Sequence, residues 1–409
     1  MKKNKPFLPH WFRYIDTERQ KQLGVDLFKN APFSVYEKES EEKRDMGIAL
    51  FLDGVFYPTT TGASYHFMNL LTGLSKDSIN VYLFRCYRGW EDPNIYRKLP
   101  FNTVCIDPTV FYDEPGLQAN LLQKYSINTL VFDTSEVILY QGAYFKEHLG
   151  LKIVHDIQNI DHVLSEKGGL SPNIVKNQKQ ELITADKFVD LYWAKTELDR
   201  TQLQDVGIDS HKIRVRYPII DTKNIHHSLR RHLGNPVKAI FLGNMFYSPN
   251  IGGLEILENT YRDCVRNDIY LEIDVVGEGD LLFLAKKFPN LNFKGKVDSI
   301  SDLFLSYQLA FACPSYGSGI SLKVLDYMAA GLPIIANSIG VRGHPSNISN
   351  YVIVDDSDSF YPAIRKLPID SKLYTRLSSS SLDYIGKYFN PQKNIYAIKK
   401  DIRELNLDL

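Results

Sequence analysis

The residues best suited to chemistry lie in the run 311–336, where the pattern predicts a strand, a glycine-rich loop, a helix and a second strand. At the start of this helix, the unpaired backbone N–H groups of Gly319, Ile320 and Ser321 add to the positive end of the helix dipole. Such a helix start favours an anion such as a diphosphate. Asp326 lies seven residues after Gly319, about two helical turns, so its side chain is expected on the same face of the helix as Gly319. A glycine loop before a helix is also an ordinary tight turn, so this loop alone does not define a function.

The segment 325–336 has the sequence Leu-Asp-Tyr-Met-Ala-Ala-Gly-Leu-Pro-Ile-Ile-Ala, which resembles the donor-binding motif of the retaining glycosyltransferases of family 4. In that family a Glu-x7-Glu motif runs into this ending, and here Asp326 stands in place of the second Glu and Ser318 in place of the first. A subgroup has Gly-Ser-Gly-Ile-x-Leu-Lys at this point, as residues 317–323 have here, so the departure is compatible with activity. The resemblance implies an α/β protein of the GT-B fold, in which two Rossmann-like domains face a central cleft and the second domain binds a nucleotide sugar.

The resemblance also assigns binding roles in the second domain. Asp326 would hold the ribose hydroxyls, because a carboxylate can accept two hydrogen bonds from a diol. The alternative for Asp326 is a helix-surface acid paired with Lys323, three residues earlier. The backbone of Val297, in a Gly-Lys-Val element, would pair with the donor base. Ser318 and the helix start at 319–321 would line the phosphates.

The leaving diphosphate gains charge as the glycosidic bond breaks, so cations must stabilise it. Family members bring an Arg and a Lys from the first loop of the second domain, whereas this chain has Asn244 and Pro249 there. Asn244 is kept as a predicted donor contact. Lys323 is the first candidate for the missing charge, because the subgroup motif has a lysine at this point. Arg342 and Arg216 are the next candidates, and for each of the three the alternative is a solvated surface cation.

In the first domain, His155 ends the predicted strand 152–155, and in related enzymes a histidine at a comparable strand end hydrogen-bonds the donor sugar near the reacting carbon. The alternative is a core histidine that caps the strand. Thr61 and Gly62 lie in the loop 58–63, which resembles the glycine-rich loop of the family's acceptor domain, although threonines replace several glycines. We expect substrate contacts there, because open α/β sheets bind ligands at such loops. No Asp-x-Asp motif stands at a strand end, so neither a metal nor a resident cofactor is expected.

Alternating strand and helix signals from residue 47 onward predict parallel sheets with helices on both faces. The first 46 residues lack this alternation, and their patch at 1–15 is aromatic and basic. The simpler interpretation of this patch is an arm packed on the protein's own surface, and the alternative is a peripheral contact with the inner face of a membrane. The predicted organisation is an N-terminal extension at 1–46, an acceptor domain at 47–220, a nucleotide-sugar domain at 221–385 and, as the resemblance implies, a C-terminal helix at 386–409 that crosses back to the first domain.

The overall composition narrows the class of protein. A length of 409 residues suits two domains of about 150 to 200 residues each. A formal net charge of +0 gives no reason to expect nucleic acid as a partner. Four widely spaced cysteines without a CxxC pattern indicate reduced thiols. No apolar run reaches the roughly 18 residues of a spanning helix, and the N-terminus lacks the apolar core of a signal peptide, so we expect a cytoplasmic protein.

The predicted function is that of a retaining, metal-independent glycosyltransferase, hexosyltransferase-like, that moves a sugar from a UDP- or GDP-sugar to a hydroxyl acceptor. The resemblance implies retention and a place in glycan, glycolipid or glycoside biosynthesis. No protein nucleophile is evident, so the protein would act by positioning and electrostatics. One alternative is a nucleotide-sugar epimerase on the same fold, which would need acid and base carboxylates. The other is a non-catalytic module that binds a partner, suggested by the absent Glu, Arg and Lys; the sugar, the acceptor and the oligomeric state are left open.

Overall fold

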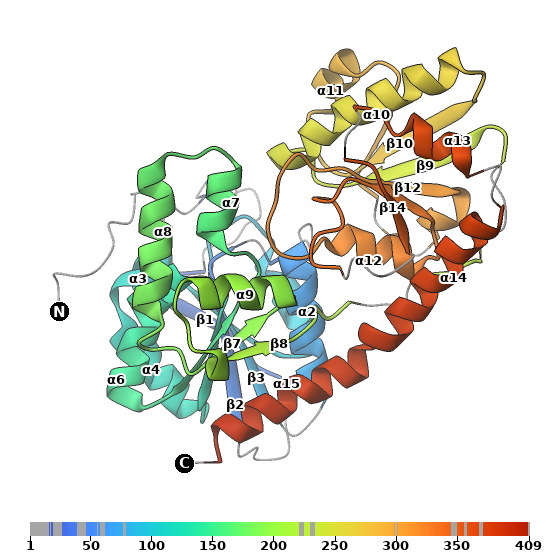
Figure 1. The fold of residues 1–409 in the computed structure, drawn as a ribbon. Coiled ribbons are helices and arrows are strands. Elements are labelled where there is room, and N and C mark those ends of the chain that lie inside the picture. Colours follow the sequence, from blue (N-terminus) through green and yellow to red (C-terminus); the bar gives the residue numbers. More distant parts are fainter. Residues whose placement is uncertain are drawn as a thin grey trace. The chain divides into compact units, whose positions relative to one another are not determined.

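The computed structural model describes residues 16, 18, 27–38, 46–54, 56–57, 62–76, 79–220, 225–229, 234–297, 299–300, 302–344, 350–355, 358–367 and 371–407. The chain divides into two compact units. The first comprises Met1–His162, Ser171–Ile219 and Gln392–Leu409, and the second comprises Val163–Leu170 and Ile220–Pro391. Each unit contains one sheet with helices packed against it (Figure 1). Two α/β units are the fold class that the sequence predicts.

The first unit is built on an eight-stranded sheet in the order β1-β4-β3-β2-β5-β6-β7-β8. Every neighbouring pair is parallel except β1 with β4. The central strand β2 is buried over almost its whole length, as expected for a parallel strand with helices on both faces. The strands are β1 Phe33–Tyr36, β2 Met46–Leu52, β3 Ile79–Cys86, β4 Asn102–Ile106, β5 Thr129–Phe132, β6 Lys152–Asp156, β7 Leu191–Ala194 and β8 Ile213–Val215.

The edge strand β1 lies in the segment that the sequence predicts to be an extension. Tyr36 of β1 pairs with Thr103 of β4, and its side chain packs into the core of this unit. Phe33–Tyr36 therefore belong to the first sheet, which corrects the predicted boundary at residue 46 for this segment. A short edge strand with no helix of its own lacks the alternation on which that boundary depends. Residues 1–15, for which a packed arm or a membrane contact was considered, lie outside the described residues.

Two layers of helices cover the first sheet. On one face, α2 buries apolar side chains, among them Phe67 and Leu70, and shares a hydrophobic core with α15. On the other face, the ring of Phe51 in β2 packs against Phe111 of α3 and Phe145 of α6. Neighbouring side chains of β2 point in opposite directions and so supply both layers. The helices of this unit include α2 Gly62–Leu74, α3 Pro108–Asp113, α4 Pro115–Lys124, α5 Ser135–Val137, α6 Ala143–Leu149, α8 Pro172–Ala185, α9 Glu197–Asp205 and α15 Pro391–Leu405. Helix α7 Asp161–Lys167 has its first two residues in the first unit and the others in the second.

The C-terminal helix α15 is tied to the first sheet by one buried carboxylate. Asp401 accepts hydrogen bonds from Nε1 of Trp193 at 3.0 Å and from the guanidinium groups of Arg214 and Arg216 at 2.6 Å. These bonds fix α15 to β7, to β8 and to the residue that follows β8. The segment from Gln392 onward lies in the first unit, six residues after the start at 386 that the sequence predicts for it.

The second unit is built on a wholly parallel sheet in the order β11-β10-β9-β12-β13-β14. The chain runs outward from β9 through β10 to β11 and then returns to β12 on the other side of β9. Parallel α/β sheets bind ligands at the carboxyl ends of the strands beside such a reversal. The elements, drawn in Figure 1, are β9 Val237–Leu242, α10 Ser248–Arg266, β10 Leu271–Val276, α11 Leu281–Lys287, β11 Asn292–Gly295, β12 Leu309–Ala312, α12 Leu322–Ala329, β13 Ile334–Ala336, β14 Tyr351–Ile353, α13 Tyr361–Lys366 and α14 Ser371–Tyr388.

The cysteines serve packing. Cys86, Cys105, Cys264 and Cys313 are all buried and free. Burial raises the pKa of Cys313 to about 12, so this residue is a neutral thiol at physiological pH. In the part of the chain that is described, no helix is both long and apolar enough to cross a membrane.

Candidate functional site

Two loops meet at the point where the strand order of the second sheet reverses. The loop after β9 leads into α10, and the loop after β12 leads towards α12. The N–H of Ser315 donates a 2.9 Å hydrogen bond to the carbonyl of Pro249, at the start of α10. The hydroxyls of Ser248 and Tyr316 lie 3.0 Å apart. The two loops therefore form one continuous surface at the carboxyl edge of the sheet.

The segment before α12 has a geometry that suits an anion. Gly319 has a φ of +64°, a left-handed conformation that glycine adopts without strain. Ser321 is the N-cap residue of α12, but its side chain makes no capping hydrogen bond. Ser318 and Ser321 are buried, and Ile320 lies between them in the loop. The helix itself begins at Leu322, so Gly319, Ile320 and Ser321 form the loop that leads into it, and their contact with a phosphate stays a prediction.

The side chain of Lys323 runs from the first turn of α12 to the end of β9. Its Nζ donates a 2.7 Å hydrogen bond to Oδ1 of Asn250 and lies 4.4 Å from the centre of the Phe241 ring. A β-carbon placed on Gly243 would lie 3.1 Å from the same nitrogen. Among the described residues no carboxylate pairs with Lys323, and burial lowers its pKa to about 8. At neutral pH the ammonium is thus a cation whose neighbours are a neutral amide and an aromatic ring.

A second cation, Arg342, lies against the loop that precedes α12. Its Nε donates a 2.8 Å hydrogen bond to the carbonyl of Ser318, and its Nη1 donates one of 2.9 Å to the carbonyl of Ile339. A β-carbon on Gly317 would lie 2.5 Å from Cζ of Arg342, so the guanidinium occupies space that only glycine leaves open. The charge of Arg342 also contributes to the lowered pKa of Lys323. The structure therefore brings Lys323 and Arg342 to one loop, although the canonical loop positions Asn244 and Pro249 carry no charge.

Asp326 lies one turn after Lys323 on α12. The two side chains do not form an ion pair, which excludes the alternative of a surface acid paired with Lys323. Among the described residues no hydrogen bond to the Asp326 carboxylate is present, and burial raises the pKa of Asp326 to about 7. A partly exposed carboxylate in this state is stabilised by any ligand that donates hydrogen bonds to it.

Asn244 and Val297 lie in neighbouring loops of the same unit. Oδ1 of Asn244 accepts a 2.8 Å hydrogen bond from the N–H of Phe246, and its carbonyl accepts one of 2.8 Å from Nδ2 of Asn250. The side chain of Asn244 is therefore occupied within its own loop. Val297 follows β11 and is partly exposed, which leaves its backbone as the part assigned to the donor base by resemblance.

Three residues support this site without having been predicted from the sequence. Asn250 joins the two loops, because it accepts from Lys323 and donates to Asn244. The hydroxyl of Tyr327 accepts a 2.6 Å hydrogen bond from the N–H of Leu242, which fixes α12 to the end of β9. Tyr247, at the N-cap of α10, lies within electrostatic range of Arg342. One feature of the sequence could have indicated Asn250: it lies two residues before Gly252 and Gly253, where the absence of side chains lets α10 pack closely against the loop after β12.

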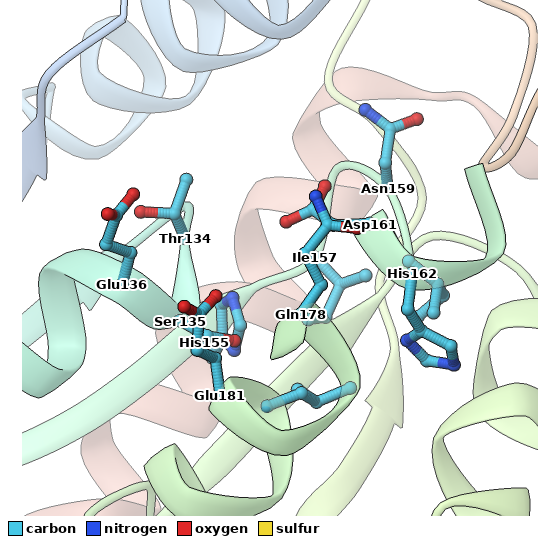
Figure 2. Close-up of a pocket in the computed structure, with 12 residues that line it drawn as sticks. Thr134, Ser135, Glu136, His155, Ile157, Asn159, Asp161, His162, Gln178 and Glu181 are labelled. Atoms are coloured by element: carbon cyan, nitrogen blue, oxygen red, sulfur yellow. The ribbon is translucent and has the colours of Figure 1, made fainter. Parts of the chain in front are cut away.

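The first unit has its own pocket, of about 110 Å³, at the carboxyl ends of β5 and β6 (Figure 2). His155 lines this pocket and is only 3% exposed, and burial lowers its pKa to about 4, so the ring is neutral. Asn159 lines the pocket as well. Asp156 does not, because neighbouring residues of a strand point to opposite faces, and it contacts His66 and Lys195 instead. The structure thus places the side chains of His155 and Asp156 on opposite faces of β6.

The remaining predicted positions have different outcomes. Thr61 lies outside the described residues, and Gly62 is the exposed first residue of α2. Arg216 is wrong as a phosphate candidate, because its Nε and Nη2 both donate 2.6 Å hydrogen bonds to the buried carboxylate of Asp401. A guanidinium held in this bidentate pair is already neutralised within the first unit.

Comparisons with known proteins bear on both units. Residues 236–370 match the family described as glycosyl transferases group 1. The crystal structure of Anabaena Alr3699/HepE in complex with UDP and glucose is similar with a TM-score of 0.68 at 14% identity, covering 87% of this chain and 99% of that one. Sucrose-phosphate synthase from Thermosynechococcus elongatus gives a TM-score of 0.73 at 13% identity, with 89% and 100% covered. A glycosyltransferase from Rickettsia africae gives 0.70 at 11% identity, with 90% and 100% covered. No curated protein matches the chain.

The two sheets, parallel apart from the edge strand β1, and their likeness to these structures define a GT-B fold. The loop with two cations and an unpaired carboxylate lies within the segment that matches the family. Residues 236–370 match the group 1 glycosyl transferases, and with the GT-B fold of both units this makes the chain a glycosyltransferase. The predicted family, fold class and enzyme class are thereby confirmed.

Proposed function

We propose that this glycosyltransferase moves a sugar, with retention of its anomeric configuration, from a nucleoside diphosphate on the second unit to a hydroxyl of an acceptor on the first unit. The observation that carries the proposal is Lys323, an ammonium without a carboxylate partner among the described residues, at the start of α12. An unpaired cation beside an uncapped helix start is suited to a diphosphate. A monophosphate or an uncharged ligand would use less of this charge.

The diphosphate would use several groups of one loop. The backbone N–H groups of Gly319, Ile320 and Ser321 would bind one phosphate, and the Lys323 ammonium would contact the other. Arg342 lies close enough to add to the positive potential of the loop and holds the loop in place through the carbonyl of Ser318. Charge-assisted hydrogen bonds of this kind are about twice as strong as neutral ones.

Asp326 would hold the ribose of the donor. A ribose offers two neighbouring hydroxyls, and an ionised carboxylate accepts from both. Burial without a partner raises the pKa of Asp326 to about 7, and two donated hydrogen bonds would lower it again. Nucleotide binding should therefore strengthen as the pH rises through about 7, because only the ionised carboxylate accepts both bonds.

The chemical step would need no nucleophile from the protein. The bond between the anomeric carbon and the diphosphate breaks, and the acceptor hydroxyl forms a bond to the same carbon from the same face. The hydroxyl proton passes to an oxygen of the leaving diphosphate. Lys323 and the helix start would stabilise the charge that develops on this leaving group, where electrostatic stabilisation contributes most. Retention and metal independence are part of the proposal.

The donor base we propose is uracil. Similar structures include Alr3699/HepE in complexes with UDP and with UDP-glucose. The predicted choice between UDP- and GDP-sugars can be made by calorimetry on the full chain, in which UDP should bind at least about tenfold more tightly than GDP. Equal affinities would remove the preference for uridine.

The reaction itself can be followed by proton NMR on the full chain with UDP-α-glucose. A retaining transferase should release UDP and give a product, or slowly hydrolysed glucose, whose anomeric proton is first observed in the α configuration. A β product would contradict retention. An epimerase would change the sugar without releasing UDP, and a non-catalytic module would bind UDP without any turnover.

A further inference from the structure

The pocket of the first unit has an unusual distribution of charge. Glu136 of α5, Asp161 of α7 and Glu181 of α8 all line it. Figure 2 shows Glu136 and Asp161 on opposite sides, with His155 and Glu181 between them in this view. No lysine or arginine is among its lining residues. The pocket therefore collects negative charge without an internal cation to balance it.

A buried lining atom without a partner also points to a missing ligand. Nδ1 of His155 has no hydrogen-bond partner, although the side chain is only 3% exposed. The backbone of Asp133 forms a hydrogen bond that favours the protonated ring, as a carbonyl does, so the ring proton lies on Nε2 and Nδ1 is an acceptor. The buried Oε1 of Gln178 is unpartnered as well. Buried acceptors of this kind are costly unless a donor satisfies them.

These groups share one requirement, because all of them accept hydrogen bonds. Among the described residues no group of three His, Cys, Asp or Glu side chains is placed to hold a metal ion. An organic ammonium group supplies three donors and one positive charge, and it matches both the charge and the acceptors of the pocket. A phosphate or carboxylate would be repelled, and a neutral polyol would satisfy acceptors but not balance charge.

On the basis of the proposed function, we propose that this pocket binds an ammonium group of the acceptor, so that the enzyme glycosylates a hydroxyl of an amine-bearing molecule. The pocket volume of about 110 Å³ suits a small group rather than a whole glycan. The rest of the acceptor would extend outside the pocket.

The pH dependence of this binding follows from the groups around Glu136. Burial raises the pKa of Glu136 to about 7, and the nearby acids add to this effect. Ammonium binding requires ionised carboxylates, so its affinity should fall as the pH drops through about 7. The acids that face Glu136 are Glu181 from α8, Asp161 from α7 and Asp53 from the loop after β2, and Asp53 is itself paired with Arg88.

The test uses three probes of nearly equal size on the full chain at pH 8: ethanolamine, ethylene glycol and glycolate. Calorimetry or NMR titration should show that ethanolamine binds at least about tenfold more tightly than ethylene glycol, as expected for charge-assisted bonds, and that glycolate does not bind. Equal binding of ethanolamine and ethylene glycol would overturn the ammonium assignment. Absence of ethanolamine binding at millimolar concentrations would overturn the site.

Two variants locate the effect. Glu181→Gln keeps the shape of the side chain but removes its charge, and it should weaken ethanolamine binding about tenfold with little change for ethylene glycol. Glu197→Gln removes a carboxylate that is 72% exposed elsewhere in the same unit and should change neither. UDP affinity reports on the second unit in every variant. If UDP binds as expected but ethanolamine does not, this inference fails alone; if the parent chain does not bind UDP, the proposed function fails.

Discussion

The cations at the carboxyl edges of the two sheets differ in their partners. In the first unit, Lys195 contacts the carboxylate of Asp156, and Arg85 pairs with Glu91 at 2.9 Å. In the second unit, Lys323 is bonded to an amide and has no carboxylate among the described residues. A buried charge paired within the protein contributes to folding, whereas an unpaired one beside a helix start is available to a ligand. The difference in partners separates the structural lysine from the functional one.

Each polar group of the cluster around Asp156 in the first unit has a partner. The N–H of Ile219 donates a 3.0 Å hydrogen bond to Nδ1 of His66, so the ring proton lies on Nε2 and is donated to Asp156 at 2.8 Å. Burial alone would raise the pKa of Asp156, but Lys195 and His66 outweigh it and lower the pKa to about 2. The cluster of His66, Asp156 and Lys195 thus joins α2, β6, the end of β7 and the last residue of the first unit before its linker.

The largest expected effect is on this paired cluster. Asp156→Asn leaves the Lys195 ammonium buried without its carboxylate and should lower the free energy of unfolding by about 3 to 5 kcal/mol in urea denaturation. The contribution should be complete above about pH 4 and decline as the pH falls towards 2, because the folded pKa lies below the unfolded one. Glu197→Gln, at an exposed ion pair, should stay within about 0.5 kcal/mol. A loss below about 1 kcal/mol for Asp156→Asn would mean that Lys195, like Lys323, does not depend on a carboxylate partner for stability, and the contrast between the two lysines would fail.

The unpaired carboxylate of the second unit gives the next effect. UDP at one hundred times its dissociation constant should stabilise the parent by about 2.7 kcal/mol, and Asp326→Ala should remove most of this stabilisation in thermal unfolding. Without UDP, the parent should lose stability as the pH rises from about 4 to 7, because its folded pKa of about 7 lies above the unfolded one. The variant should lack this pH-dependent loss. An unchanged response to UDP in Asp326→Ala would remove the ribose assignment.

A smaller effect is expected where a cation depends on a glycine. In Gly317→Ala the new β-carbon would lie 2.5 Å from Cζ of Arg342, so the guanidinium must move. Calorimetry should then show UDP affinity reduced by about three- to tenfold, the loss of one charge-assisted contact. Gly54→Ala meets no atom within 4 Å and serves as the control. If both variants bind UDP like the parent, Arg342 does not contribute to the phosphate loop.

Removal of metal ions is expected to have no effect on turnover. The two cations would stabilise the leaving diphosphate in place of a metal, so turnover measured as UDP release should be the same before and after treatment with EDTA. Complete loss of activity, restored by magnesium or manganese, would show that Lys323 and Arg342 do not suffice for the leaving group.

Local patterns predicted much of the fold, because buried parallel strands are short apolar runs and helices repeat every three to four residues. They also located the loop and Asp326. Edge strand β1 was missed because a short strand without its own helix carries little periodicity. The partner of Arg216 could not be predicted, since Asp401 lies 185 positions later in the chain. By contrast, the separation of His155 from Asp156 follows from strand alternation and could have been predicted.

The central claim is that Lys323 holds a diphosphate because it lacks a carboxylate partner. The most direct measurement is calorimetry of UDP and UMP binding to Lys323→Met, which keeps the aliphatic stem over Phe241 and removes the charge. Lys287→Met is the matched control, because that exposed lysine pairs with Glu255 at 3.2 Å in the same unit. UDP binding to Lys323→Met should weaken about tenfold or more, equivalent to roughly 1.5 to 3 kcal/mol, while UMP binding changes less and the control changes neither. If Lys323→Met binds both nucleotides as the parent does, Lys323 is a solvated helix residue and the contrast with Lys195 has no functional meaning.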